Sequence, residues 1–467
     1  MGLLTISQFG TKLLSFFLVP LYTNVLTTEE YGTYDLFNTT ISLLIPILTL
    51  NIVDASLRFA IDKHTDKNDV FSISIHYVLK GSALILLVSL GNHLLKVNEI
   101  LDQYWYFFVL MFAVSALNGV VSYFARGIDR VADVSAAGIL TSATMIGLNI
   151  LFLLPLKMGI SGYFLASIIG SFAGTGYLLI RIRAWQYFRL RPVQNALKKE
   201  MLSYSEPLIA NSIAWWINNA SDRYVVTWLC GLAANGIYSV GYKIPSILNI
   251  FQTIFNQAWT LSAVKDFDPE DKDGFFSRMY NLYNFGMVFI CSVLILSARL
   301  IAKILYAKDF YAAWKYVPFL MIAIVFGSLS GYIGGIFSAV KQSKIFAQST
   351  VIGAASNIIM NLCLVHLFGP IGAAVSTAVS FWLVWAIRVK HLKRYLRIRM
   401  YPIRDSIAYG LLVVQTLLLL FFQTETIGLY AVEILITGFL VLLFLRELKM
   451  IAHPILNKIR SRSAGGR

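Results

Sequence analysis

The chain has 467 residues, of which 57% are hydrophobic and 13% are charged, and its mean hydropathy is +0.69. Soluble domains carry about 25% charged residues, so this composition excludes an ordinary soluble protein and indicates one continuous membrane domain. The net charge of +15 would suit nucleic-acid binding. The basic residues cluster in alternate loops, however, which is typical of membrane topology and predicts no nucleic-acid partner.

Apolar stretches long enough to cross a bilayer follow one another along the whole chain. They cover 3–26, 35–59, 71–95, 104–125, 134–156, 160–181, 203–230, 236–262, 279–302, 314–339, 346–367, 371–389, 405–422 and 427–445. Cys230, Cys291 and Cys363 form no motif and are interpreted as packing residues. We therefore expect an all-α polytopic membrane protein with about 14 transmembrane helices.

The loops predict an orientation. With both termini in the cytoplasm, 29 of the 39 Lys and Arg residues fall on the inner side and only six on the outer side. Such an excess of inner positive charge sets the topology of membrane proteins. We therefore expect an even number of crossings.

The two halves of the chain repeat. A shift of 204 residues aligns Tyr31–Leu44 with Asn235–Leu248 and places Gly32 on Gly236. Because six spans separate equivalent points, both copies enter the membrane the same way up, which predicts two six-helix lobes related by a pseudo-two-fold axis along the membrane normal. Chance similarity among glycine-rich apolar helices is the alternative. The predicted segments are an N-lobe (1–182), a basic cytoplasmic linker (183–200), a C-lobe (201–390), a basic cytoplasmic loop (391–404), two further helices (405–448) and a basic cytoplasmic tail (449–467).

Several cations lie inside or at the ends of the predicted spans. Lys12, Arg223 and Lys243 fall within spans, and Arg58 ends the second span one turn after Asp54. A charge near the bilayer centre costs at least about 2.5–3.5 kcal/mol and normally faces a partner or water. Our hypothesis is that these cations line a cleft and bind a pyrophosphate or an acidic sugar. The alternative is structural, with Arg58 paired to Asp54 and the two lysines snorkelling.

Polar residues of spans 7 and 8 complete the candidate site. Asn218 and Asn256 lie near tryptophans, a combination that suits sugar binding, although hydrogen bonds between helices explain the amides equally well. Asp54, Asp222 and Glu206 are candidates for ion coupling or charge pairing, and an interfacial position is the alternative for Glu206.

Motifs for chemistry are missing. The sequence contains no GxxxxGK[ST], HExxH or CxxC, and its six His residues lack ligand spacing. No segment is large enough to hold a soluble transferase domain. The sequence therefore argues against an enzyme and predicts no catalytic residue, metal or cofactor.

Three runs carry a family resemblance. They are PLYTNVLTTEEYGTYDLFNTTISLLIPILTLNIVDASLRF (20–59), SDRYVVTWLCGLAANGIYSVGYKIP (221–245) and GGIFSAVKQSKIFAQSTVIGAASNIIMNLCLVHLFGPIGAAVSTAVSFW (334–382). In this order they resemble the bacterial Wzx-like oligosaccharide flippases, the polysaccharide-transporter branch of the multidrug/oligosaccharidyl-lipid/polysaccharide (MOP) superfamily. The leader before Lys12 is shorter than is usual in that family. A partial first helix or a misassigned start codon would explain this difference.

The resemblance implies a V-shaped pair of lobes that moves undecaprenyl-pyrophosphate-linked repeat units, for O-antigen, capsule or exopolysaccharide, across the bacterial cytoplasmic (inner) membrane by alternating access. It implies a cavity role for Lys12, Arg58, Arg223 and Lys243, and a groove for the lipid tail at 405–422 and 427–445. The expected partners are the lipid-linked oligosaccharide, membrane lipids and a polysaccharide polymerase, and the chain is expected to be a monomer.

Three alternatives remain open at this point. A multidrug cation antiporter of the same superfamily would need acidic groups deep in the cleft, where this chain places Lys12. A lipid II flippase would share the cationic cleft. A non-transporting scaffold for polysaccharide assembly would tolerate substitutions in the cleft.

Overall fold

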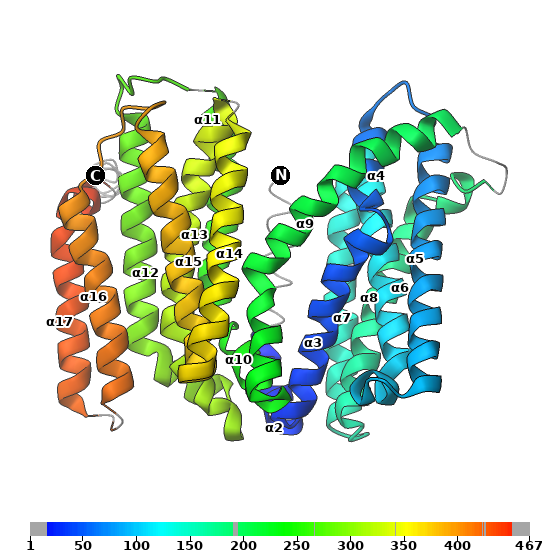
Figure 1. Cartoon of the computed structure of the whole chain (residues 1–467), viewed down its shortest axis with the longest axis horizontal. Helices are drawn as coiled ribbons and strands as arrows, with labels where there is room; N and C mark the ends of the chain where they lie inside the picture. The colour runs from blue at the N-terminus through cyan, green and yellow to red at the C-terminus, as the bar shows by residue number, and fades with distance from the viewer. Residues whose placement is uncertain are drawn as a thin grey trace, which may run out of the picture. The chain divides into compact units, whose positions relative to one another are not determined.

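The protein is all-helical in the parts that the structure describes (Figure 1). The computed structural model describes residues 16–189, 195–265, 267–340, 342–422, 424 and 426–450. It divides into two compact units, the first formed by Met1–Ser239 with Leu305–Phe310 and the second by Val240–Ile304 with Tyr311–Arg467. The repeat would instead place the lobe boundaries at 182 and 201, and that division stays a prediction.

The first unit contains the helices up to α10, whose last two residues belong to the second unit. They are α2 (Val19–Val25), α3 (Thr28–Leu48), α4 (Ile52–Ile61), α5 (Lys67–Leu95), α6 (Glu99–Gly127), α7 (Val131–Leu153), α8 (Gly159–Arg181), the 3₁₀ turn η1 (Ala184–Gln186), α9 (Asn195–Cys230) and α10 (Leu232–Gly241).

Most of the second unit is built from the helices that follow α10. They are α11 (Pro245–Lys265), α12 (Phe275–Leu305), the 3₁₀ segment η2 (Lys308–Lys315), α13 (Val317–Ala339), α14 (Ser343–Phe368), α15 (Pro370–Leu392), α16 (Pro402–Phe421) and α17 (Ile427–Leu443). The first residues of η2 and the end of α12 belong to the first unit.

The predicted second span, 35–59, is a broken pair of helices rather than one helix. The side chain of Thr27 and the carboxylate of Glu30 form a reciprocal capping box that starts α3. Pro46 lacks the N–H that would continue the helix, and Leu50 and Asn51 adopt left-handed conformations with φ of 52° and 50°. The chain therefore bends by 59° between α3 and α4.

The eighth predicted span is also broken. Residues 236–262 were expected as one helix, but α10 ends at Gly241 and α11 begins at Pro245. Within the described residues, nine helices are long and apolar enough to cross a membrane, and α3 with α4 makes a tenth when counted as one bent span. The total of 14 helices stays a prediction, and most of the first predicted span lies outside the described residues.

Two helix hairpins, one in each unit, each contain a close approach at a glycine. A shift of 210 residues in the sequence places Gly162, in the first turn of α8, on Gly372, in the first turn of α15. A Cβ at Gly372 would overlap the carbonyl oxygen of Leu364 on α14, and a Cβ at Gly162 would crowd Phe152 on α7. Glycine thus permits the same close helix–helix approach in both hairpins.

An ion network joins three helices at one end of the second unit. The guanidinium of Arg404 on α16 donates to Asp405, to Glu447 at 2.6 Å and to the amide oxygen of Asn281 on α12 at 2.7 Å. It also lies 4.2 Å from the ring centre of Phe444. Because Asp405 and Glu447 are buried, the single cation balances two carboxylates that would otherwise lack a counter-ion.

We expect Arg404→Met to destabilise the protein by about 3–5 kcal/mol, because removing one partner of a buried ionic network leaves uncompensated charge. The thermal unfolding temperature of the purified protein in detergent measures this loss. Arg394→Met is the matched control, since Arg394 is exposed. Equal melting temperatures for the two variants would contradict this account.

Candidate functional site

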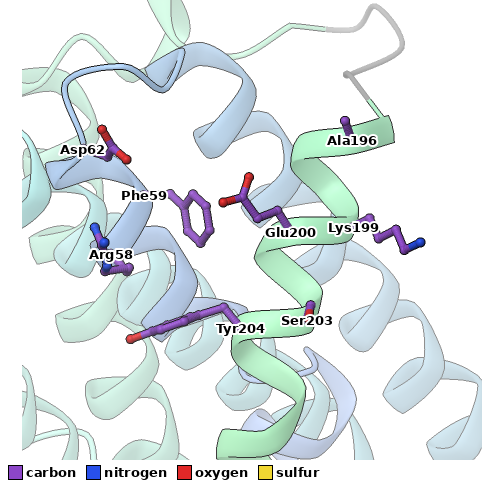
Figure 2. Close-up of a pocket in the computed structure, with 8 residues that line it drawn as sticks. All are labelled: Arg58, Phe59, Asp62, Ala196, Lys199, Glu200, Ser203 and Tyr204. Atoms are coloured by element: carbon purple, nitrogen blue, oxygen red, sulfur yellow. The ribbon is translucent and has the colours of Figure 1, made fainter.

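A cavity of about 660 Å³ with charged and aromatic residues in its lining lies between α4 and the first turns of α9. Its lining combines charge of both signs with aromatic rings: Arg58, Phe59, Asp62, Ala196, Lys199, Glu200, Ser203 and Tyr204. Figure 2 shows Glu200 and Tyr204 pointing from α9 toward α4, whereas Lys199 points to the other side of α9. The ring centres of Phe59 and Tyr204 are 6.1 Å apart, edge to face.

Local hydrogen bonds determine the ionisation state of Asp62 in this cavity. Asp62 follows the last residue of α4, and the backbone N–H of His64 donates to its carboxylate at 3.0 Å. That hydrogen bond lowers the pKa of Asp62, so Asp62 is ionised at neutral pH. The ammonium of Lys67 donates to the backbone carbonyl of Asp62. The cavity therefore offers a guanidinium, at least one carboxylate and two aromatic rings to a ligand.

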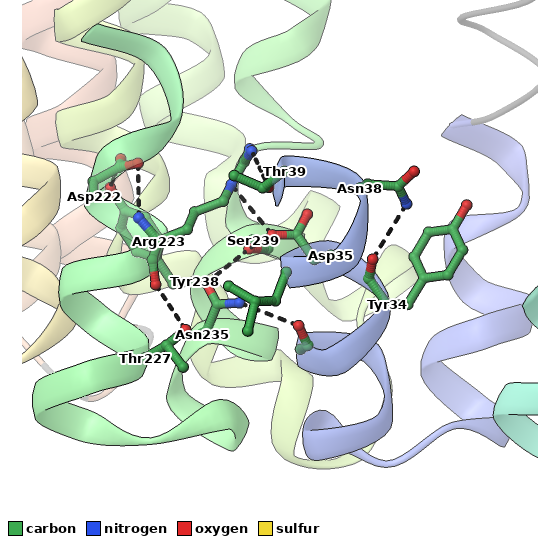
Figure 3. A network of polar contacts seen from close by, with 12 residues as sticks. Tyr34, Asp35, Asn38, Thr39, Asp222, Arg223, Thr227, Asn235, Tyr238 and Ser239 are labelled. Carbon is green, nitrogen blue, oxygen red and sulfur yellow. Dashed lines mark hydrogen bonds and ion pairs between the residues drawn. The ribbon is translucent and has the colours of Figure 1, made fainter. Parts of the chain in front are cut away.

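A second polar cluster lies on α3, α9 and α10, near the other end of α9 (Figure 3). The Nε of Arg223 lies 3.3 Å from Oδ2 of Asp35, and its Nη1 donates to the hydroxyl of Thr39. Both members of the ion pair are largely buried, with 19% and 16% of their side chains exposed. Asp222, the preceding residue, accepts a hydrogen bond of 2.6 Å from the hydroxyl of Tyr238. We call these residues, with Asn235 and Ser239, the α3–α10 network.

The α3–α10 network also joins repeat-equivalent positions. Ser239 is the equivalent of Asp35 at the offset of 204 and donates to its carboxylate at 2.6 Å. The amide of Asn235 donates to the backbone carbonyl of Gly32. A Cβ at Gly32 would overlap the carbonyl oxygen of Leu232, and a Cβ at Gly236 would overlap that of Thr28. The two copies of the repeated segment therefore cross at their equivalent glycines.

Further hydrogen bonds extend this contact along α3 and α9. The indole N–H of Trp216 donates to the carbonyl of Thr39 at 2.9 Å. The hydroxyls of Thr40 and Tyr224 are also hydrogen-bonded to each other. These bonds hold the last four turns of α9, about 15 residues, against the middle of α3.

The structure brings together only some of the predicted site residues. Arg223 and Asp222 share the α3–α10 network, and Asn218 lies one turn earlier on α9, with its amide donating to the carbonyl of Ala214. Arg58 lines the cavity instead. Lys12 lies outside the described residues.

The other predicted residues lie elsewhere. The predicted pair of Asp54 with Arg58 is absent from the described structure: Asp54 accepts from the amide of Asn51 at 2.7 Å, and Arg58 is exposed. Glu206 is exposed on α9. In the second unit, Lys243 lies in the break between α10 and α11 rather than within a helix.

Asn256 lies on α11 and packs against Gly331 on α13. The approach is close, because a Cβ added at Gly331 would lie only 2.9 Å from the amide nitrogen of Asn256. Its contact is therefore with a neighbouring helix of the second unit.

Sequence reasoning missed Asp35, the partner of Arg223. The predicted span began at residue 35, so Asp35 was placed at a membrane boundary, whereas α3 begins at Thr28 and buries it two turns inside. The capping box formed by Thr27 and Glu30 carries the signal that would have found it, because it marks the true helix start. No sequence pattern marks Glu200 and Tyr204 as site residues, because only the fold places them opposite α4.

These features define a multi-pass membrane protein with charged and aromatic groups held between apolar helices. Residues 1–261 match the model of the polysaccharide biosynthesis protein family. The chain belongs to this family.

Two curated archaeal proteins are similar to the chain. A probable low-salt glycan biosynthesis flippase, Agl15, of Haloferax volcanii is 23% identical over 226 residues, covering 45% of this chain and 47% of that protein. An uncharacterized membrane protein of Methanocaldococcus jannaschii is 21% identical over 238 residues, covering 47% of each. The matched part of the chain thus spans about half the length of these relatives.

Solved structures share the fold. The lipid II flippase MurJ in an inward closed conformation superposes with a TM-score of 0.72 at 15% identity, covering 98% of this chain and 100% of that one. An inward-facing multidrug resistance MATE family transporter of the MOP superfamily gives 0.64 at 12% identity, covering 86% and 96%. The chain therefore shares its fold with these two solved membrane proteins.

We expect Gly236→Ala to lower stability by about 1–3 kcal/mol, because the added methyl group would overlap the backbone of α3 and force the crossing helices apart. Gly147→Ala is the matched control, since no atom lies within 4 Å of a Cβ at that position on α7. Thermal unfolding in detergent compares the two variants. If Gly236→Ala melts no lower than Gly147→Ala, the close crossing of α3 and α10 is refuted.

Proposed function

We propose that this protein is a flippase that moves lipid-linked oligosaccharides across a membrane by alternating access. The observation that carries the proposal is the cavity between α4 and α9, because it offers a guanidinium, carboxylates and aromatic rings at the end of a membrane bundle. Membership of the polysaccharide biosynthesis protein family supports this choice. A similarity to a probable glycan biosynthesis flippase supports it further.

The chemistry of the cavity suits a glycan attached to phosphate. Arg58 offers a planar fork of N–H donors, which matches phosphate oxygens in a bidentate geometry. Asp62 and Glu200 offer acceptors for sugar hydroxyls. Tyr204 is 43% exposed as a residue, so its ring can meet the apolar face of a sugar. These groups stabilise the charged and polar headgroup within the cavity.

The lipid part of the substrate needs an apolar path. In the second unit, a cavity of about 340 Å³ lies among α13, α15 and α16 and is lined mainly by apolar side chains, including Phe319, Ile322, Val379, Trp382 and Val413. Such a surface suits a polyprenyl chain, because it buries hydrocarbon without leaving polar groups unbonded. We propose α16 and its neighbours as the tail groove, in place of a groove formed by α16 and α17 alone.

Alternating access requires polar contacts that can form and break. In the α3–α10 network the ion pair of Asp35 with Arg223 and the hydroxyl bonds of Tyr238 and Ser239 join three helices. In our proposal the contacts of this network are formed while the headgroup enters between α4 and α9. These contacts break when the protein changes to the state that releases the headgroup.

The finer identity of the substrate follows from the family resemblance. We propose an undecaprenyl-pyrophosphate-linked repeat unit as the substrate, both termini in the cytoplasm and the bacterial inner membrane as the location. We further propose action as a monomer, with a polysaccharide polymerase as a partner and with no chemical step on the substrate.

We expect Arg58→Ala to slow flipping about 10–100-fold, because a hydrogen bond to a charged phosphate contributes about 1.5–3 kcal/mol. Proteoliposomes that contain a lipid-linked oligosaccharide with a fluorescent sugar measure the initial rate, through quenching by a reagent that reaches only the outer leaflet.

Lys63→Ala is the matched control for this experiment. Lys63 is an exposed cation five residues away and is not among the cavity residues. We expect it to flip at the wild-type rate. Equal flipping rates for Arg58→Ala and wild type would contradict the proposal that the substrate passes through this cavity.

A further inference from the structure

A buried carboxyl on α17 accepts no hydrogen bond of ordinary geometry. The side chain of Glu433 is fully buried, neither carboxylate oxygen has a hydrogen-bond partner in the described structure, and the side-chain amide of Gln415 lies beside it. An ionised carboxylate in such a place costs several kcal/mol, so the group avoids this cost by holding a proton. Glu433 lies near the middle of α17, a helix otherwise almost wholly apolar.

The backbone around Glu433 is part of a polar cluster in which three helices meet. Gln415 on α16 donates to the carbonyl of Glu433 and accepts from Ser292 on α12. Thr437, one turn along α17, bonds both to Ser292 and to the carbonyl of Glu433. These bonds occupy the amide and the two hydroxyls without using the carboxyl oxygens of Glu433.

A buried cation with unused donors lies close to this cluster. Arg299 follows Ser292 by two turns on the same face of α12, about 10 Å along the helix, and 1% of it is exposed. Its Nη2 donates to the carbonyls of Leu419 and Phe422, and its guanidinium lies 4.2 Å from the ring centre of Trp314. Its Nε and Nη1 have no partner in the described structure.

The unused groups of the two residues are complementary in charge. The Nε–H and Nη1–H donors lie on different edges of the guanidinium, so each of them can donate a single charge-assisted hydrogen bond to a carboxylate oxygen. No ion pair between Arg299 and Glu433 is formed among the described residues. A movement of α17 along α12 toward Arg299 would be needed to form one.

We propose that Glu433 is a proton-binding site that alternates between a neutral acid in this conformation and a carboxylate paired with Arg299 in another. The step is the loss of the carboxyl proton to water and its recovery. The proposed site lies on α17, after the duplicated part of the chain. Only the coupling of this proton site to flipping rests on the proposed function.

The other polar groups around Glu433 cannot take its place. The groups of α12, α16 and α17 that contribute to the cluster are Ser292, Arg299, Gln415 and Thr437. The remaining charged residues of α12 and α16, of η2 and of the described segment after α17 lie toward or beyond the helix ends: Arg278, Lys303, Lys308, Asp309, Lys315, Arg404, Asp405, Arg446, Glu447 and Lys449. Glu433 is thus the acid within this apolar part of the unit.

Infrared difference spectroscopy of the full chain in lipid vesicles tests the proton site without any substrate. A protonated carboxyl gives a carbonyl band distinct from that of a carboxylate. We expect wild type to show this band at neutral pH, Glu433→Gln to lose one component of it, and Glu433→Asp to keep that component at a shifted frequency. The exposed control Glu99→Gln should retain the wild-type spectrum. An unchanged band in Glu433→Gln overturns the proposal.

A transport measurement tests the coupling. We expect an imposed pH gradient to change the wild-type flipping rate several-fold and to leave the rate of Glu433→Gln unchanged, while Glu99→Gln responds like wild type. A full gradient response in Glu433→Gln would refute the coupling role. If wild type itself flips no lipid-linked oligosaccharide, the proposed function fails, and the infrared result still decides whether Glu433 binds the proton.

Discussion

Charged groups among apolar helices must find their partners within the protein, because hydrocarbon offers neither water nor counter-ions. Asp35 and Arg223 meet this requirement in the first unit, and Arg404 meets it in the second by balancing Asp405 and Glu447. The positions of these pairs determine which helices are held together. Polar contacts that join helices in this way are strong in one conformation and available for exchange in another.

Helix α9 connects the two polar regions of the first unit. Tyr204 lies at the cavity near the start of α9 and Arg223 lies in the α3–α10 network, about 29 Å away along a regular helix. Pro207 interrupts the hydrogen bonds between these points. A rotation of α9 would therefore change the cavity and the network together, and the proline provides a position where the helix can bend.

Much of the fold was predictable from sequence, because apolar length and helix-ending residues are local properties. The predicted spans correspond to the observed helices from α5 to α8 and from α12 to α17 within about five residues, whereas α9 begins eight residues before its predicted span. The two failures, at 35–59 and 236–262, are breaks that depend on backbone conformation at Asn51 and around Lys243. Hydropathy does not register such breaks, since both flanking helices are apolar.

The candidate site was less predictable, because pairing depends on which helices come together. A mid-span cation at Arg223 was visible in the sequence, but its partner Asp35 lies 188 positions earlier in the chain. The sequence hypothesis rested on the cations within the spans and therefore left out Glu433, although this acid lies inside the predicted span 427–445. Its burial became evident only once the neighbouring helices were in place.

The contact of Gly32 with Gly236 joins equivalent positions of a duplicated sequence, as the two sides of a symmetric homodimer do. In a homodimer each residue on the axis meets its own copy, so an aspartate there would face a second aspartate and be repelled. Within one chain the two copies are encoded separately and can differ in sequence. Asp35 can therefore face Ser239, which donates a hydrogen bond to it, instead of a second aspartate as in a homodimer.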